Sequence, residues 1–398
     1  MPGHRAGYYR LALILGAQTA MGPLAIDTYL PALPTITREF ATTASAVQLS
    51  LSVYFIGIAA GQAVYGPLSD RYGRRPPLFV GLALFIAGSL GCALAPDVWT
   101  LVAFRFVQAL GGCAPLVIPR AVVRDLFDER DSVRMLSVLM LVMGLAPILA
   151  PLIGGQMLEY LGWRSIFWAY AIYGAFLLVV VSLALEESLP VARRTRQPLR
   201  AVLTTYGRLL ADWRYLGYVL AGGLIFAGLL AYISGSPFIF IELFHISPQR
   251  FGFYFGVNAI GIIAASQVNR FLVHRYPARD VLTVALWISL FASIGLLAGG
   301  FTLYGGLAGI VVPLWFFIAM HGIVSPNTTA LAMGPHGAVA GSASALLGTV
   351  QFLLGAGAGA LIGALADGTA RPFAAVLAAC GLGAFLLLRL TRAPATRA

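Results

Sequence analysis

Residues 66–76 read GPLSDRYGRRP and join two long apolar runs, residues 45–68 and 76–95. The glycines and the proline favour a tight turn, and Asp70 lies at the end of a predicted helix, with three arginines among the six residues that follow. A loop between two membrane helices explains the arginines, because cationic side chains collect at cytoplasmic headgroups. It does not explain the placement of the glycines and the aspartate, which indicates a more specific role for the loop.

The composition of the whole chain is that of a membrane protein. Of 398 residues, 59% are hydrophobic and only 10% are charged, and the mean hydropathy is +0.86. Soluble globular proteins have about 25% charged residues. Apolar runs of eighteen or more residues recur along the sequence, so we expect a polytopic helical membrane protein. Residues 1–10 form a short basic leader, and the first span is expected to act as an uncleaved signal.

The pattern predicts an all-α fold with twelve transmembrane helices. Their expected bounds are residues 9–31, 45–68, 76–95, 98–119, 135–158, 163–185, 214–237, 249–269, 280–300, 303–325, 338–364 and 370–388. If both termini are cytoplasmic, 21 of the 26 arginines lie in cytoplasmic segments and four lie outside, with Arg105 left inside a span. This asymmetry predicts that both termini are cytoplasmic.

The longest polar connection, residues 186–213, divides the spans into two sets of six. We therefore expect an N-terminal six-helix half at 1–190, a cytoplasmic linker at 191–213 and a C-terminal six-helix half at 214–398. Apolar side chains recur at helical spacing in the linker: Leu199, Val202, Leu203, Tyr206, Leu210 and Trp213. This pattern indicates an amphipathic helix that lies on the inner leaflet or packs beneath the two halves.

The two halves are related by an offset of 204 residues. The matching positions are Val64, Leu68, Arg71, Tyr72 and Arg75 with Val268, Leu272, Arg275, Tyr276 and Arg279, and Gly144 and Gly155 with Gly348 and Gly359. Parallel six-span repeats are typical of secondary transporters, whose substrate site lies at the midplane between the repeats.

The sequence argues against several other classes of protein. All 26 basic residues are arginine, so neither the lysine of a P-loop nor a Schiff-base lysine is present. The formal charge of +11 lies in the loops between spans, which indicates a membrane topology and no nucleic-acid partner. No span carries a nucleophile with a base, and the five histidines are scattered without ligand spacing, so we expect neither an enzyme nor a metal site. Cys92, Cys113 and Cys380 lie in apolar runs and are expected to be core residues.

Asp27 is the only acidic residue inside one of the predicted spans. An ionisable group there costs roughly 2.5–3.5 kcal/mol on insertion scales and indicates a functional site. At 1.5 Å per residue, Asp27 lies ~6 Å and Arg105 ~10 Å from the same predicted membrane boundary, so the two could interact directly or through water. The alternative for Asp27 is an interfacial residue that reaches water, and the alternative for Arg105 is an anchor for neighbouring carbonyl groups.

The loop at residues 66–76 resembles the G-x-x-x-D-R-x-G-R-R signature of the major facilitator superfamily and matches it completely. The resemblance implies a conformational latch formed by Gly66, Asp70, Arg71, Gly73, Arg74 and Arg75. It also implies that Asp70 approaches the N-terminus of the eleventh span near residues 341–344, where a helix dipole favours an anion. A nearby arginine, such as Arg120 or Arg124, could pair with Asp70.

Two further spans carry motifs of the same superfamily. Residues 105–112, RFVQALGG, resemble the arginine motif of the fourth span in proton-coupled members. The fifth span resembles the antiporter motif, with Ala150 where the usual pattern has glycine. The antiporter motif residues are Gly144, Pro147, Pro151, Gly154 and Gly155. The alternative for this motif is generic helix packing, because small residues allow close contact and prolines allow bending.

Residues 26–34, 236–242, 251–258 and 340–349 narrow the resemblance to the bicyclomycin/chloramphenicol-resistance (Bcr/CflA) subfamily of drug–proton antiporters. Better-studied relatives carry a second membrane acid two turns before the aspartate, whereas Thr19 stands there in this chain. A scheme with two acids is therefore not supported, and Asp27 is expected to carry proton coupling alone.

The resemblance implies a monomeric multi-pass protein of the bacterial inner membrane that exports small amphipathic drugs in exchange for protons. It needs no cofactor apart from protons as the coupling ion. From the polar and aromatic pattern, the candidate substrate-binding residues are Tyr29, Gln48, Tyr54, Gln108, Tyr232, Asn258, Asn327 and Gln351. The main alternative is a proton-coupled exporter or symporter of a small metabolite, such as an amino acid or peptide. A non-transporting receptor or scaffold is a second alternative, against which the buried acid and the repeat argue.

Overall fold

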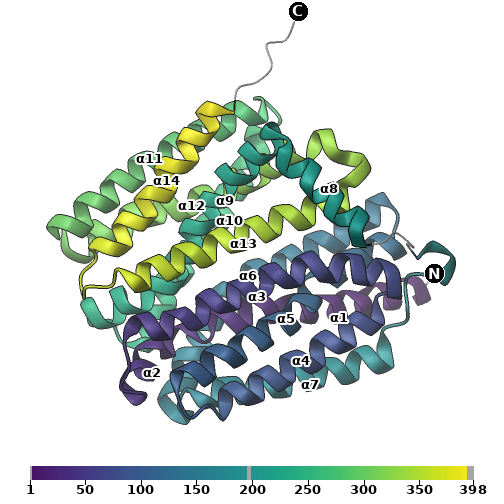
Figure 1. Cartoon of the computed structure of the whole chain (residues 1–398), viewed down its shortest axis with the longest axis horizontal. Helices are drawn as coiled ribbons and strands as arrows, with labels where there is room; N and C mark the ends of the chain where they lie inside the picture. The colour runs from purple at the N-terminus through teal and green to yellow at the C-terminus, as the bar shows by residue number, and fades with distance from the viewer. Residues whose placement is uncertain (1, 195–198, 392–398) are drawn as a thin grey trace, which may run out of the picture. The chain divides into compact units, whose positions relative to one another are not determined.

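The computed structural model of the protein describes residues 2–194 and 199–391, which form helices joined by turns, with no β-strand among them (Figure 1). Twelve helical segments within these ranges are long and apolar enough to cross a membrane. The predicted fold class, an all-α polytopic protein with twelve transmembrane helices, is confirmed.

The chain divides into two compact units, Met1–Leu199 with Ile246–Gly256, and Arg200–His245 with Val257–Ala398. The helices up to residue 199 are α1 (Pro2–Asp27), the 3-10 turn Leu30–Ala32, α2 (Leu33–Glu39), α3 (Ala44–Tyr72), α4 (Arg75–Ala93), α5 (Val98–Leu126), α6 (Glu129–Leu161), α7 (Arg164–Ala184) and the 3-10 turn Val191–Arg193. The helices that follow are α8 (Leu199–Ala211), α9 (Trp213–Pro237), the π-helical turn Phe238–Leu243, α10 (Pro248–Leu272), α11 (Ala278–Thr302), α12 (Gly306–Met333), the 3-10 segment Gly334–Val339, α13 (Ala340–Ala364) and α14 (Arg371–Leu390). The predicted domain bounds stay a prediction.

Short polar residues begin several of these helices. The side chain of Thr43 accepts a hydrogen bond from the backbone N–H of Ala46 at the start of α3, and Asp97 accepts two from the first turn of α5. Each bond satisfies an N–H group that has no partner within its own helix. Gly73 and Gly162 end α3 and α6 with φ angles of 95° and 77°, which glycine adopts without strain.

In the first unit, α5 packs against both α3 and α4, α4 packs against α7, and α1 packs against α6. Small residues allow these close contacts. A Cβ placed on Gly57 of α3 would lie 2.6 Å from the Cβ of Ala109 on α5. Cys92 and Cys113 are buried and free, as is Cys380 in the second unit, so the prediction that they are core residues is confirmed.

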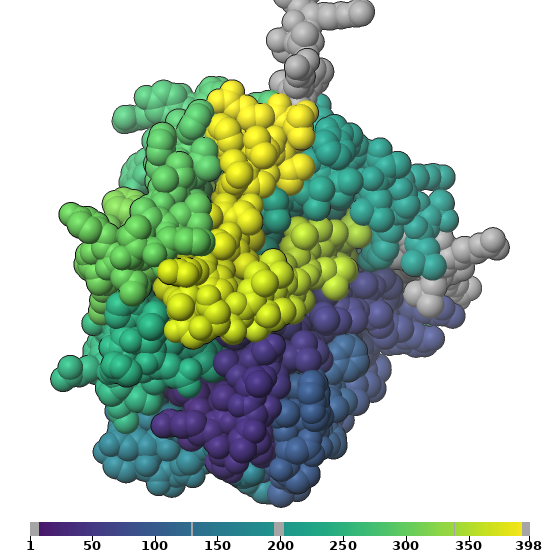
Figure 2. All heavy atoms as spheres, turned by 60° about the vertical axis from the view of Figure 1, so that its left-hand side comes forward, coloured from purple at the N-terminus to yellow at the C-terminus, as the bar shows by residue number. Residues whose placement is uncertain are grey.

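The second unit repeats this packing. In it, α9 packs against α13, as α1 packs against α6 in the first unit. Likewise, α11 packs against α12 and α14, as α4 packs against α5 and α7. In the space-filling view, α13 and α14 form one continuous surface in yellow tones (Figure 2). Arg75 donates to the carbonyl oxygen of Ser182 near the end of α7 at 3.0 Å, and its match Arg279 donates to that of Thr391 beyond α14 at 2.6 Å. The equivalent roles of these arginines support the internal repeat.

Helix α7 has an exposed apolar face that is suited to contact with lipid. Large apolar side chains on it are exposed at intervals of three or four residues: Trp168, Ile172, Phe176, Val179 and Leu183. This spacing places them on one face of the helix. A stripe of this size is unfavourable in water, whereas it suits a hydrocarbon environment.

The first span differs from the prediction. Residues 9–31 were expected to form it, but α1 ends at Asp27 and the apolar segment continues through the 3-10 turn and α2 to Glu39. Pro31 lacks the N–H that would bond to the carbonyl of Asp27, and Pro34 lacks the one for Leu30, so α1 cannot continue. Asp27 therefore stands at a break within the span.

The predicted linker helix is present as α8. Leu203 and Leu210 are exposed, whereas Leu209 is buried. The side chains of residues 199–202 lie outside the described part of the structure. Whether α8 lies on the inner leaflet or packs beneath the two halves stays open.

Candidate functional site

Asp27 is buried at the break in α1, with only 4% of its surface exposed. The candidate span continues for twelve residues beyond it, to Glu39, so the expected position four residues from the end of the span is wrong. Its carboxyl group has no hydrogen bond or ion pair with any residue that the structure describes. The burial argues for a side chain that faces the protein interior, while its role in proton coupling stays a prediction.

The break leaves the last carbonyl groups of α1 without partners in the helix, because a helix end always exposes four such groups. The carbonyl oxygen of Leu24 still accepts from the N–H of Thr28 at 3.2 Å, and two side chains from other helices bind this end of α1. Arg105 of α5 donates through Nη1 to the carbonyl oxygen of Ala25 at 3.1 Å. Tyr170 of α7 donates its hydroxyl to that of Leu24 at 2.9 Å. The end of α1 is thus fixed from two sides, within three residues of Asp27.

Arg105 is fully buried among aromatic rings. Its Cζ lies 4.1 Å from the ring centroid of Tyr54, 4.8 Å from that of Tyr29 and 5.8 Å from that of Phe167. Ring faces attract a cation, most strongly where water is excluded. Nη1 also donates to Oε1 of Gln108 at 2.6 Å. The structure therefore brings together three of the predicted substrate-binding residues, Tyr29, Tyr54 and Gln108, around Arg105.

Two donors of Arg105 are left without a partner. Nε and Nη2 are buried and make no hydrogen bond with the described residues, and the hydroxyl of Tyr54 has none either. Arg105 and Asp27 approach the same turn of α1, but no ion pair joins them in the part of the chain that the structure describes. A buried cation with unsatisfied N–H groups is costly, so these groups are available to an incoming acceptor.

Gly154 of the predicted antiporter motif packs directly on this break. A Cβ added to Gly154 would overlap the carbonyl oxygen of Thr28, the residue after Asp27. Tyr29, the next residue in the turn after α1, shares a hydrogen bond of 3.1 Å with the hydroxyl of Ser50 on α3. Pro147 and Pro151 lie inside α6, between Gly144 and Gly154 in sequence. Gly154 therefore lets α6 reach the backbone beside Asp27.

We expect Gly154→Ala to destabilise the protein by about 1–3 kcal/mol, the usual cost of overpacking a tight contact, and to reduce transport. Gly16→Ala is the matched control on the same pair of helices, because a Cβ there would lie 3.6 Å from Cγ2 of Val142, an ordinary contact. Thermal unfolding in detergent and a transport assay measure the two effects. Equal stability of both variants would contradict the role of Gly154.

The other five predicted substrate-binding residues are not grouped around Arg105 by any described contact. In the second unit, Asn258 donates to the hydroxyl of Tyr232 at 3.1 Å, and Asn327 donates to Oδ1 of Asn269 at 2.6 Å. Gln351 is half-buried on α13, and Gln48 is buried on α3. The structure thus does not gather all eight residues around one group, and their role in substrate binding stays a prediction.

The predicted latch loop is held by ion pairs within the first unit. Arg74 is buried and binds Asp70 at 2.6 Å and Asp125 at 2.7 Å. Burial alone would lower the pKa of Arg74, but its hydrogen bonds to Asp125 and Asp70 outweigh burial and raise it. Asp70 therefore pairs with Arg74, and the expected partners Arg120 and Arg124 are wrong. The described contact of Arg120 is with the sulfur of Met143, at 3.8 Å.

The other members of the loop have different surroundings. Arg71 lies over the ring of Tyr72, with Cζ 5.4 Å from its centroid. A Cβ on Gly66 would meet no atom within 4 Å. Asp125, Glu187 and Ser188 complete the network. Sequence reasoning missed them because Asp125 and Glu187 stand 51 and 113 residues from Arg74 and carry no local signal.

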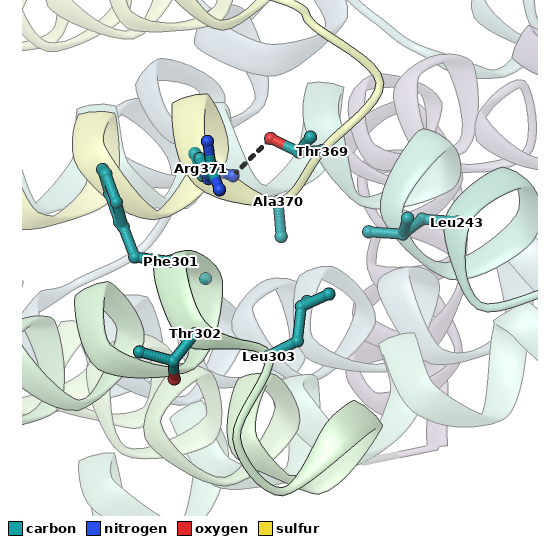
Figure 3. Close-up of a pocket in the computed structure, with 8 residues that line it drawn as sticks. Leu243, Phe301, Thr302, Leu303, Thr369, Ala370 and Arg371 are labelled. Carbon is teal, nitrogen blue, oxygen red and sulfur yellow. Dashed lines mark hydrogen bonds between the residues drawn. The ribbon is translucent and has the colours of Figure 1, made fainter.

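A separate small pocket of about 270 Å³ lies in the second unit, at the end of α11 and the start of α14 (Figure 3). Its lining residues are Leu243, Gly300, Phe301, Thr302, Leu303, Thr369, Ala370 and Arg371. The backbone N–H of Arg371 donates to the hydroxyl of Thr369 at 3.2 Å. None of the predicted substrate-binding residues lines this pocket.

The fold is that of known transporters. The xylose transporter XylE of E. coli, in a partially occluded inward-open structure, has a TM-score of 0.76 at 14% identity and covers 99% of each chain. A bacterial homologue of the human lysosomal transporter Spinster has a TM-score of 0.75 at 16% identity over the full length of both chains. The described residues, with twelve helical segments long and apolar enough to cross a membrane, thus have the fold of these multi-pass transporters.

The sequence matches the Major Facilitator Superfamily over residues 15–360, and the chain belongs to this family. It is 39% identical to the uncharacterised transporter YdgK of Bacillus subtilis, over 92% of this chain and 91% of that protein. It is 29% identical to a bicyclomycin resistance protein homologue of Haemophilus influenzae, over 92% of each. A chloramphenicol resistance protein of Pseudomonas aeruginosa is also 29% identical, over 89% of this chain and 82% of that protein. These relatives confirm the resemblance to the Bcr/CflA subfamily, and the chain is a transporter and not an enzyme.

Proposed function

We propose that this protein is a proton-coupled antiporter of the bacterial inner membrane that exports small amphipathic antimicrobial compounds. The observation that carries the proposal is the buried carboxyl group of Asp27, which has no partner among the described residues. Arg105 binds the carbonyl oxygen of Ala25, two residues before it, and keeps two N–H groups unpaired. The names of the relatives, which include bicyclomycin and chloramphenicol resistance proteins, support the substrate class.

Asp27 exchanges a proton for substrate because it cannot hold both. A carboxyl group in an apolar cavity favours its neutral form, whereas water or a cation favours the ionised form. Substrate binds the proton-free state, and protonation from outside displaces the substrate. Arg105 stabilises the ionised state through Nε and Nη2, the two donors that have no other partner in the described residues.

The proton gradient supplies the energy for export. Moving one charge across the membrane is worth ~2.3 kcal/mol per 100 mV. Proton influx therefore drives substrate uphill as the transporter opens in turn to either side of the membrane. In this proposal both termini are cytoplasmic, the protein acts as a monomer, and Gly66, Asp70, Arg71, Gly73, Arg74 and Arg75 form a cytoplasmic latch that sets the rate of opening.

The test is a transport assay in everted membrane vesicles that hold a pH gradient. Adding a transported compound should partly collapse the gradient, because each export cycle moves protons the other way. A broad panel of amphipathic antimicrobials should contain active compounds, and vesicles without the protein should give no response. If no drug in the panel responds but amino acids or peptides do, the proposed substrate class is wrong.

A further inference from the structure

Glu187 stands three residues beyond the end of α7 and caps a different helix. Its Oε1 accepts hydrogen bonds from the backbone N–H groups of Arg74 at 2.8 Å and Leu189 at 3.0 Å. Its Oε2 accepts one from the N–H of Arg75 at 3.1 Å. Arg74 and Arg75 begin α4, whose first N–H groups have no partner within the helix. The carboxylate also suits the positive end of the helix dipole.

Gly73 provides the room for this contact. With a φ angle of 95° it turns the chain between α3 and α4, and a Cβ there would lie only 2.5 Å from Oε2 of Glu187. Glycine is thus required at position 73 for two reasons: its backbone conformation and the close approach of the Glu187 carboxylate.

Ser188 makes a second attachment. Its hydroxyl donates to Oδ2 of Asp125 at 3.0 Å, and Asp125 also accepts from Nε and Nη2 of Arg74 at 2.7 Å and 3.1 Å. Glu187 therefore fastens the chain after α7 to the start of α4, and Ser188 fastens it to the end of α5. This chain leads directly into the connection between the two halves.

The charge of Glu187 is stable at neutral pH. Burial alone would raise the pKa of its carboxyl group, but hydrogen bonds from the N–H groups of Arg74, Leu189 and Arg75, together with the nearby charge of Arg194, hold the pKa below its usual value. The bonds of the carboxylate therefore persist under cytoplasmic conditions and weaken only as the pH falls through this lowered pKa.

We propose that Glu187 is a positioning residue of the transport cycle, which fixes the start of the inter-half connection to the latch loop and so sets how fast that loop rearranges. The inference rests on the proposed function of the latch. The hydrogen bonds of Glu187 with the described residues come from the backbone N–H groups of Arg74, Arg75 and Leu189. The residue therefore acts on the rate of the conformational step and not on the affinity for substrate.

The experiment compares Glu187→Gln with Glu186→Gln, which makes the same change in charge at the exposed neighbouring residue. In proteoliposomes, Glu187→Gln should lower the maximal rate of transport about five-fold or more while KM stays within about two-fold, as for a residue that binds no substrate. Glu187→Asp keeps the charge and should recover part of the rate. Glu186→Gln should behave like the wild-type protein.

A second measurement does not depend on transport. Trypsin cleavage after Arg193 and Arg194 in detergent should be roughly three-fold faster in Glu187→Gln, because release of the tether raises local opening. Ser188→Ala should also speed trypsin cleavage after Arg193 and Arg194. This second variant tests the tether if Glu187→Gln does not fold. Cleavage equal to that of Glu186→Gln, or a change in KM without a change in maximal rate, would overturn the proposal. If the wild-type protein transports no test compound, the cleavage rates still decide about the tether.

Discussion

Asp27→Asn should abolish uphill export and leave the protein folded. A membrane potential of about 100 mV can drive roughly fifty-fold accumulation for each proton exchanged, and this ratio should fall to about one in the variant. Asparagine has the shape of the protonated acid but cannot ionise, so it cannot exchange a proton for substrate. Because the carboxyl group makes no bond with the described residues, thermal stability should stay the same or rise slightly.

The measurement is substrate accumulation in everted vesicles, with and without an imposed gradient, and thermal unfolding in detergent. Asp131→Asn is the matched control, since the side chain of Asp131 is 43% exposed and pairs with the exposed Arg134 at 3.2 Å. The control should keep full export. Persistent uphill export by Asp27→Asn would show that proton coupling does not depend on this residue.

Arg105→Lys should reduce export about ten-fold or more and destabilise the protein by about 2 kcal/mol, because hydrogen bonds of charged groups contribute about 1.5–3 kcal/mol. Arginine presents a planar fork that stacks on rings, whereas lysine is a compact charge on a flexible stem. The lysine would lose the contact with the ring of Tyr54 and the planar geometry that serves Ala25 and Gln108 together. The unsupported end of α1 would then shift beside Asp27.

Arg134→Lys is the control for this change, because an exposed ion pair contributes only about 0–1 kcal/mol. Arg105→Lys should have a lower unfolding temperature and a lower maximal transport rate than Arg134→Lys. Export at the wild-type level by Arg105→Lys would mean that charge alone, without the guanidinium geometry, is sufficient at this site.

The apolar spans and the two charged residues inside them could be predicted from the sequence because both leave local signals. A run of apolar residues that matches the thickness of the hydrocarbon core predicts a span whatever its neighbours are. A charged residue inside such a run stands out for the same reason, and Asp27 and Arg105 were found in this way. The latch loop was found because its glycines and charges lie within eleven consecutive residues.

The contacts of these residues could not be predicted in the same way. Arg105 binds a backbone carbonyl 80 residues away, and Arg74 binds Glu187 through its N–H from 113 residues away. Carbonyl and N–H groups occur at nearly every position, so the sequence does not single out the ones that a side chain will reach. The partner of Asp70 was mispredicted for a related reason, because several arginines are near the loop and only the fold selects Arg74.

The sequence by itself determined that this protein has twelve apolar spans, with one acid and one arginine inside the predicted spans, because hydrophobicity and charge are properties of each residue. The tertiary structure alone decided that α1 breaks at Asp27, that Arg105 and Tyr170 hold its broken end, and that Glu187 caps α4. These features arise from helix ends. Backbone groups left without a partner there must find one elsewhere in the fold, and only packing determines which side chains come close enough.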